Sequence, residues 1–301
     1  MSVSRSAVMA RAATLRPTRP SFAWTGEDSL RVACATALML PLLLLAVFFG
    51  AALLDAWPRL NLTFLTSMPS RVAEDAGILP ALAGTAWLLV LTALLAIPLG
   101  VGAAVYLEEY ARPGRMTRLI EVNISNLAGV PSIIYGLLAL EVFVRAAGMG
   151  RSVLAGACTL ALLLLPVVIT ATREALRTVP TTLREAALGL GAERWQVMWR
   201  VVLPMSLPGI ITGVVLSLSR AVGETAPLIM VGALGYVAFV PTSVQSAFTA
   251  LPIQIFNWIS RPQAAFHSNA AAAMVVLLLL MLALNALAML VRRRVQRAAA
   301  H

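Results

Sequence analysis

The sequence predicts an all-α, polytopic membrane protein with six transmembrane helices. Of its 301 residues, 60% are hydrophobic and 12% are charged, whereas soluble domains are close to half apolar and about a quarter charged. The mean hydropathy of +0.87 indicates that much of the chain faces lipid. Six apolar runs each reach the roughly 20 residues that a helix needs to cross a bilayer. They cover residues 32–54, 80–107, 122–144, 153–172, 207–231 and 269–291.

The flanks of these runs support each span in turn. The first run follows an arginine-containing arm and has no small-residue cleavage site, so we expect a retained helix rather than a removed signal peptide. Pro131 favours a bend in the third run. The fourth and sixth runs end at arginines, and the fifth contains two charged residues, Arg220 and Glu224.

The chain divides into four predicted segments. Residues 1–29 are polar and rich in Pro, Ser and Arg, and we expect them to form a mobile cytoplasmic arm. Residues 30–76 hold the first transmembrane helix and an outer loop. Residues 77–294 form the main transmembrane domain, and residues 295–301 form a cytoplasmic tail.

The arginines flank the runs asymmetrically, which predicts the orientation of the chain. If both termini lie inside, the inner ends of the spans carry most of the arginines. By the positive-inside rule, both termini are therefore cytoplasmic. The net charge of +10 then reflects orientation in the membrane rather than binding to nucleic acid. The outer ends carry only Arg59, Arg71, Arg145, Arg151 and Arg261.

Composition also excludes several classes of enzyme. All 23 basic residues are arginines, so the chain has neither a Schiff-base lysine nor a complete P-loop nucleotide site. His267 and His301 are too few for the usual zinc patterns, and Cys34 and Cys158 lie apart in apolar runs. We therefore expect no cofactor, no metal site and no catalytic residues on this chain.

Residues 173–204 form an inner segment that is too regular for a simple connector. Pro180 prevents a continuous helix, the spacing of Thr182 and Glu185 predicts a capping box, and Gly191 suits a left-handed helix end. An exposed helix with an apolar face favours docking into a groove of another protein. The alternative is that Glu185 only caps its own helix. The apolar face comprises Leu183, Ala186, Ala187 and Leu190.

Arg220 and Glu224 stand four residues apart inside the fifth run, so they share a helix face, which Ser217 borders. An ionised side chain at mid-membrane costs about 2.5–3.5 kcal/mol, and such residues usually face a bundle interior and mark a substrate pathway. A guanidinium suits a tetrahedral oxyanion, and Glu224 would hold it in position. The alternative is a structural pair that neutralises itself and rigidifies the span.

The inner segment resembles the EAA loop of bacterial ABC importer permeases. Residues 185–191 and 201–204 match the pattern EAA-x3-G-x9-I-x-LP, with Val201 in place of the usual isoleucine. The resemblance implies a type I ABC importer permease fold, in which this loop inserts a coupling helix into a cleft of a separate ATPase. It also implies that ATP and magnesium are bound by that partner chain.

Three further stretches resemble PstA-type permease subunits of bacterial phosphate importers. Residues 219–228 match the pattern RA-x-GETAPL, and residues 126–136 match NLAGVPSIIYG. Residues 251–258 are similar to an outer segment, LPVQIYNW, that paired PstC-type subunits usually lack. The similarity extends over residues 77–294.

This resemblance implies that the chain forms half of a phosphate pathway in the bacterial inner membrane. The implied partners are a PstC-type permease, a pair of PstB-type ATPases, a PstS-type binding protein, inorganic phosphate and the lipid bilayer, with no nucleic acid. A permease for sulfate, molybdate or phosphonate, and a membrane scaffold that signals phosphate supply, remain alternatives. We assign the pathway to Arg220, Glu224 and Ser217, and ATPase coupling to Thr182, Leu183, Glu185, Ala186, Ala187, Leu190 and Gly191.

Overall fold

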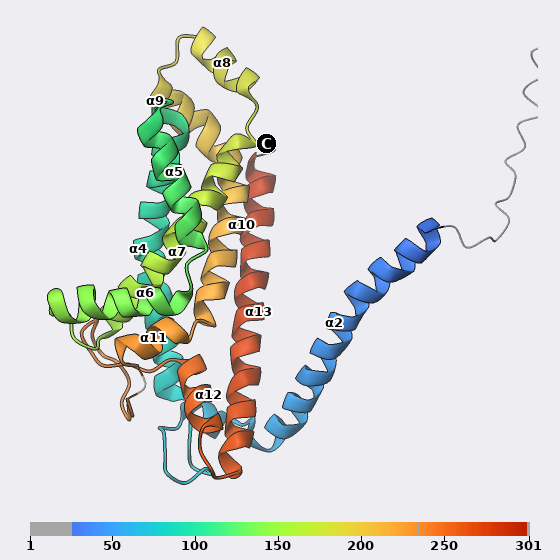
Figure 1. The fold of residues 1–301 in the computed structure, drawn as a ribbon, viewed down its shortest axis with the longest axis vertical. Coiled ribbons are helices and arrows are strands. Elements are labelled where there is room, and N and C mark those ends of the chain that lie inside the picture. The colour runs from blue at the N-terminus through green and yellow to red at the C-terminus, as the bar shows by residue number, and fades with distance from the viewer. Residues whose placement is uncertain (1–25, 234, 300–301) are drawn as a thin grey trace, which may run out of the picture. The chain divides into compact units, whose positions relative to one another are not determined.

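The computed structural model describes residues 26–233 and 235–299, and every regular element in these ranges is helical (Figure 1). The predicted arm lies outside the described residues up to residue 25, and the chain is helical from Gly26 on. The last helix continues to Ala299, into the predicted tail. The α-helices are α2 (Gly26–Ala56), α3 (Leu62–Thr66), α4 (Leu79–Val105), α5 (Arg115–Ala128), α6 (Ser132–Ala139), α7 (Val153–Arg177), α8 (Thr181–Gly189), α9 (Arg194–Val197), α10 (Leu203–Val222), α11 (Ala226–Val231), α12 (Leu251–Ile259) and α13 (Ala265–Ala299).

Four short segments have other helical geometries. A 3₁₀ turn, η1 (Trp57–Arg59), follows α2. Three π-helical segments continue or precede longer helices: η2 (Tyr106–Tyr110) after α4, η3 (Leu140–Ala146) after α6, and η4 (Met198–Val202) before α10. Such π turns are rare and often occur near functional sites.

Helix α2 forms the first candidate span by itself. It has 31 residues with Pro41 in its interior, and the span from Glu27 to Arg59 has a mean hydropathy of 2.6 over its most apolar window. A helix of this length reaches across the hydrocarbon core. The first predicted span, residues 32–54, is therefore helical throughout.

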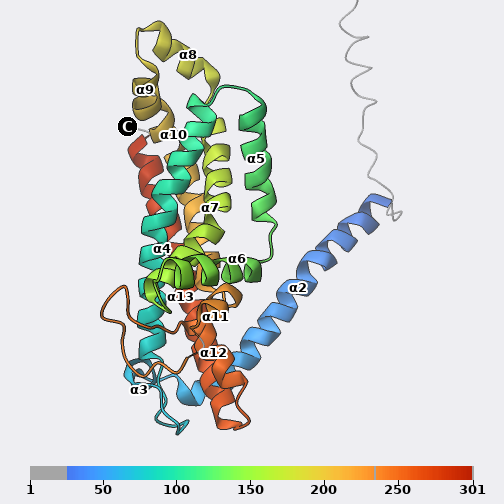
Figure 2. The same ribbon diagram turned by 60° about the vertical axis from the view of Figure 1, so that its left-hand side comes forward.

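Helices α4, α7, α10 and α13 run side by side (Figures 1 and 2). Small residues let their backbones approach closely, as is typical of helices packed within a membrane. A Cβ atom placed on Gly100 of α4 would lie 2.6 Å from Val168 Cγ1 of α7, and one on Gly209 of α10 would lie 2.8 Å from Ala175 Cβ of α7. The helices predicted from the second, fourth and sixth runs are confirmed.

The third run is not one straight span. Helices α5 and α6 meet at an angle of 104°, because Gly129 ends α5 and Pro131, which has no backbone N–H, starts α6 in an extended conformation. The hydroxyl of Tyr135 donates to the Leu127 carbonyl across this break, at 2.8 Å. The bend that Pro131 favours is thus present, but it divides the run into two differently directed helices.

The boundaries predicted for the fifth run, residues 207–231, are wrong. The span begins earlier, at Arg194, and continues through η4 to Val222. There it stops, and α11 begins separately at Ala226. Pro227 explains the break, because its ring would clash with the carbonyl of residue 223 in a continuous helix.

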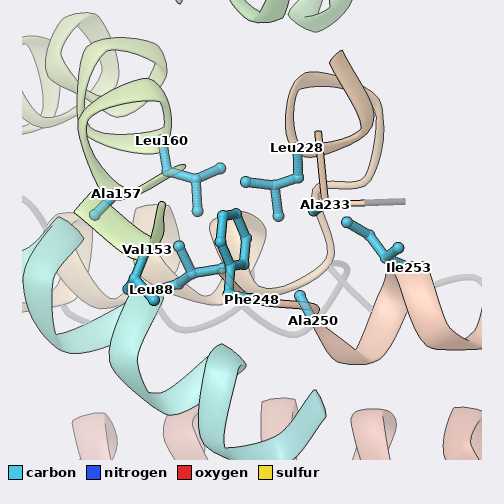
Figure 3. Packing of buried hydrophobic residues seen from close by; sticks show 9 residues of the cluster. All are labelled: Leu88, Val153, Ala157, Leu160, Leu228, Ala233, Phe248, Ala250 and Ile253. Carbon is cyan, nitrogen blue, oxygen red and sulfur yellow. The ribbon is translucent and has the colours of Figure 1, made fainter. Parts of the chain in front are cut away.

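A buried apolar cluster holds α11 and the start of α12 against the long helices (Figure 3). Phe248 lies at its centre and closely approaches α7, since a Cβ on Gly156 would lie 2.6 Å from its Cζ. Within a membrane, such contacts stabilise through van der Waals packing rather than through exclusion of water. The cluster comprises Leu88, Val153, Ala157, Leu160, Leu228, Ala233, Phe248, Ala250 and Ile253.

At the α12 end of the bundle, Arg59 and Asn269 tie α13 to the loop that precedes α4. Arg59 Nε donates to Asn269 Oδ1 at 2.6 Å, and its two Nη atoms donate to the carbonyls of Glu74, Ala73 and Ala76. The amide of Asn269, which is fully buried, donates to the Ala73 carbonyl at 2.8 Å. The side chain of Asn269 thus accepts a hydrogen bond from the Arg59 guanidinium and donates one to a backbone carbonyl.

Replacing Asn269 with alanine is expected to destabilise the protein by about 1–3 kcal/mol, because a buried donor and acceptor lose their partner. Thermal unfolding of the purified protein in detergent measures this change. Asn123→Ala is the matched control, because the Asn123 side chain is exposed and, in the part of the chain that the structure describes, bonds only to the Leu119 carbonyl of its own helix. Equal melting temperatures for the two variants would contradict the expectation.

Candidate functional site

Arg220 lies in the last turn of α10, and Glu224 lies just beyond the helix end. The Nε atom of Arg220 donates to Glu224 Oε1 at 3.4 Å. The arginine side chain is 61% exposed, whereas that of the glutamate is only 14% exposed. The carboxylate is therefore held in the bundle and touches one edge of the guanidinium, whose other donors have no partner among residues 26–233 and 235–299.

The neighbours of Arg220 explain why it points outward. Ala221 and Val222 are buried, and Ser219 Oγ donates to Asn285 Oδ1 of α13 at 2.7 Å. These contacts fix the rotation of α10 and leave one exposed stripe along its other side. The stripe includes Met205, Thr212, Leu216 and Arg220.

The structure does not bring Ser217 together with the exposed side of Arg220. Its side chain is on the buried side of α10, at 2% exposure, and its hydroxyl donates to the Gly213 carbonyl of its own helix at 2.8 Å. Such a bond leaves little hydrogen-bonding capacity for a passing ion. A pathway role for Ser217 stays a prediction.

The helix break that carries Glu224 is braced by α6. Gly136 of α6 faces Pro227 of α11 so closely that a Cβ on the glycine would lie 2.7 Å from the Cα of Pro227. Residues 126–136 and 219–228, two distant stretches of sequence, thus meet at one place. Helix α6 therefore supports the start of α11, two residues after Glu224.

Helix α8 forms a second candidate site, at the opposite end of the bundle from α12 (Figure 1). It begins at Thr181 after the extended residue Pro180, and it has no side-chain cap. The predicted capping box of Thr182 and Glu185 is therefore wrong, because Thr182 already lies inside the helix. A capping box does occur in the next helix, where the side chain of Gln196 accepts from the backbone N–H of Glu193 at 3.0 Å.

The end and the apolar face of α8 agree better with the sequence. Gly191 has a φ of +87°, the left-handed conformation expected there. Leu183, Ala186 and Leu190 are exposed, Leu190 to 90%. Ala187 turns inward and packs against a buried apolar cluster that includes Val197. Three of the four residues predicted for the apolar face are thus exposed to another surface.

Sequence reasoning missed an ion-pair network beside α8. Glu108 of η2 pairs with Arg173 and Arg177 of α7 at 3.1 and 2.8 Å, and Arg173 also pairs with Glu121 of α5 at 2.6 Å. Separately, Arg184 of α8 pairs with a second glutamate of η2, Glu109. The available signal was a glutamate pair at the end of the second apolar run, on the same predicted side as the arginine-rich inner segment.

Comparison with known proteins places this geometry in a family. Residues 96–301 match the family described as binding-protein-dependent transport system inner membrane component. The matched residues include both the Arg220–Glu224 pair and α8. They therefore cover most of the chain and both candidate sites.

Individual relatives agree with this match. A phosphate transport system permease protein PstA 1 of Mycobacterium tuberculosis is 40% identical over 190 residues, 63% of this chain and 61% of that protein. The match thus spans less than two thirds of the length of that relative. PstA of Pasteurella multocida is 32% identical over 263 residues, 84% of this chain and 92% of that protein. The probable ABC transporter permease YqgI of Bacillus subtilis is 35% identical over 210 residues, 70% of this chain and 69% of that protein.

Solved structures share the fold at lower identity. The inward-facing MetNI methionine ABC transporter matches with a TM-score of 0.56 and 23% identity, over 73% of this chain and 94% of that one. A bacterial ABC transporter for import of the acidic polysaccharide alginate matches with a TM-score of 0.59 and 17% identity, over 89% and 98%. The fold is that of type I ABC importer permeases, and the chain belongs to the family of binding-protein-dependent transport system inner membrane components.

Proposed function

We propose that this chain is a permease subunit of an ATP-driven importer of inorganic phosphate and forms half of its translocation pathway. The observation that carries the proposal is the Arg220–Glu224 pair, in which a shielded carboxylate holds an open guanidinium at a helix break. A cationic side chain that faces lipid from a membrane-spanning helix has a high free-energy cost. It is favourable beside a water-filled path that carries an oxyanion. The relatives named PstA make phosphate the first candidate.

The partners follow from what this chain presents. A PstC-type permease would cover the exposed stripe of α10 and complete the pathway. A pair of PstB-type ATPases would bind the apolar face of α8 and supply ATP and magnesium, so this chain itself would catalyse nothing. A PstS-type protein would deliver phosphate from outside. In this arrangement α8 and both termini would lie on the cytoplasmic side, which the arginine distribution supports.

In the proposed mechanism, ATP binding closes the ATPase pair and draws the α8 helices of the two permeases together. The movement would turn the pathway from inward-open to outward-open, so that Arg220 is reached from alternate sides. The Arg220 guanidinium would offer its positive charge to the passing ion in both states.

Uptake into proteoliposomes that contain the complete importer tests the substrate. We expect labelled phosphate to accumulate only with ATP and the binding protein present, and unlabelled phosphate to compete better than sulfate, molybdate or phosphonate. If another anion competes better than phosphate, that anion rather than phosphate is the substrate. ATP hydrolysis without transport of any of these anions would favour the signalling scaffold.

A further inference from the structure

Helix α8 has few contacts with the rest of the chain, and the side chain of Arg184 makes most of its polar ones. Within the described chain, none of its residues is buried. An extended Pro180 precedes it, and the left-handed Gly191 follows it. Apart from the packing of Ala187, these two links alone would leave its position loosely determined.

Arg184 supplies the missing anchor. Its side chain is 20% exposed, and its guanidinium donates through Nη1 to the Glu109 carboxylate and through Nη2 to the Leu176 carbonyl, the latter at 2.7 Å. In the described part of the chain, no other α8 side chain has a hydrogen bond or ion pair outside its helix. One residue thus connects α8 with the end of α7 and with η2, which continues α4.

The anchor point is itself fixed to the long helices. Glu108, the neighbour of Glu109, is bound by Arg173 and Arg177 of α7, and Arg173 is bound in turn by Glu121 of α5. The central pair is shielded, since the side chains of Arg173 and Glu108 are 13% and 16% exposed, whereas Arg177 and Glu121 are more open. An ion pair of this kind holds its geometry better than one between flexible surface side chains.

We propose that the Arg184–Glu109 pair is a positioning strut that transmits movement of α8 to α4 and, through Glu108 and Arg173, to α7. The inference rests on the proposed function, because it assumes that an ATPase pushes on α8. Helix α7 packs directly against α10, where Gly209 meets Ala175. Without the strut, the residues that link α7 to α8 would absorb the push, and α4 and α7 would not move together with α8 and the span Arg194–Val222 that carries Arg220.

Charge reversal tests the strut in the complete importer reconstituted into proteoliposomes. Arg184→Glu and Glu109→Arg are each expected to lower phosphate transported per ATP hydrolysed by about tenfold, because each leaves two like charges in contact. The ATPase subunits should still co-purify with the permease. The double variant should recover most of this ratio, since the pair is restored with its charges exchanged. An unchanged ratio in the single variants, or no recovery in the double variant, would overturn the proposal.

A second experiment measures the distance between α8 and η2 and needs no transported ion. Spin labels are placed at Thr181 in α8 and at Arg112 after η2, in a chain whose Cys34 and Cys158 are replaced by serine. We expect the distance between the labels to stay constant when nucleotide binds to the importer, and to change or broaden once Arg184→Gln is introduced.

Arg194→Gln is the control, because Arg194 lines the same cavity beside α8 and Glu109 but forms no ion pair within the described residues. It should behave as the wild type does. A label distance that moves equally in the wild type and the Arg184→Gln variant would overturn the strut. Because this readout needs no substrate, failure of phosphate uptake in the wild type would count against the proposed function alone.

Discussion

Replacing Arg220 with glutamine is expected to reduce phosphate uptake by about 100-fold while the importer remains assembled. Glutamine keeps hydrogen-bonding capacity, but it is shorter and loses the charge that would attract an oxyanion, and preorganised donors of this kind have effects of about this size. Glu224 would then lack its only ionic partner among the described residues. Uptake of labelled phosphate into proteoliposomes, with subunit stoichiometry measured on the same preparation, checks both parts of the expectation.

Arg145→Gln is the matched control for this experiment. Arg145 also pairs with a glutamate four residues away, Glu141, at 2.9 Å, but both side chains are largely exposed. Such pairs contribute little, so uptake should stay near that of the wild type. Full uptake by the Arg220 variant would show that this pair is structural, as the alternative interpretation of the sequence holds.

Replacing Gly136 with alanine is expected to destabilise the protein by about 1–3 kcal/mol, which is typical of overpacking a close contact. The new Cβ would lie 2.7 Å from the Cα and 3.0 Å from the carbonyl oxygen of Pro227, and neither backbone atom can move without shifting α11. Because α11 follows Glu224 directly, phosphate uptake should fall with stability. Thermal unfolding and uptake measured together test this, and Gly136→Val should have a larger effect than Gly136→Ala.

Gly129→Ala provides the comparison from the same stretch of sequence. A Cβ there would meet only the Asn126 carbonyl oxygen, at an ordinary 3.5 Å, and the φ of −90° suits alanine. Its melting temperature should match that of the wild type. If both alanine variants melt alike, close packing of α6 on α11 does not limit stability.

Hydropathy predicted the long helices well because the length of a membrane span is set by the thickness of the bilayer rather than by the partners of the helix. Helices α4, α7 and α13 therefore lie where the apolar runs predicted them. The left-handed Gly191 was also predictable, because glycine adopts that conformation without steric penalty. The residues within each segment determine both the long apolar helices and this glycine turn.

The remaining features depend on residues that are distant in sequence. Hydropathy cannot distinguish a straight span from α5 and α6, which meet at 104°, since the two helices taken together are apolar enough to form one span. The break at Gly223 looked like part of a helix because Arg220 and Glu224 keep helical spacing across it. Arg184 and Glu109 are 75 positions apart, and only the packing of α8 beside η2 brings them into contact.

The open flank of α10 has a consequence for how a cell can make this protein. The flank carries the charged Arg220 side chain, which pairs with Glu224 of the same chain. Exposing this side chain to the hydrocarbon of the bilayer would destabilise the isolated subunit. In the proposed importer, a second permease subunit that covers this flank would therefore stabilise the chain in the bilayer as well as complete the pathway. Balanced synthesis of the two permease subunits would follow, because a surplus of this one would leave the charged flank against lipid.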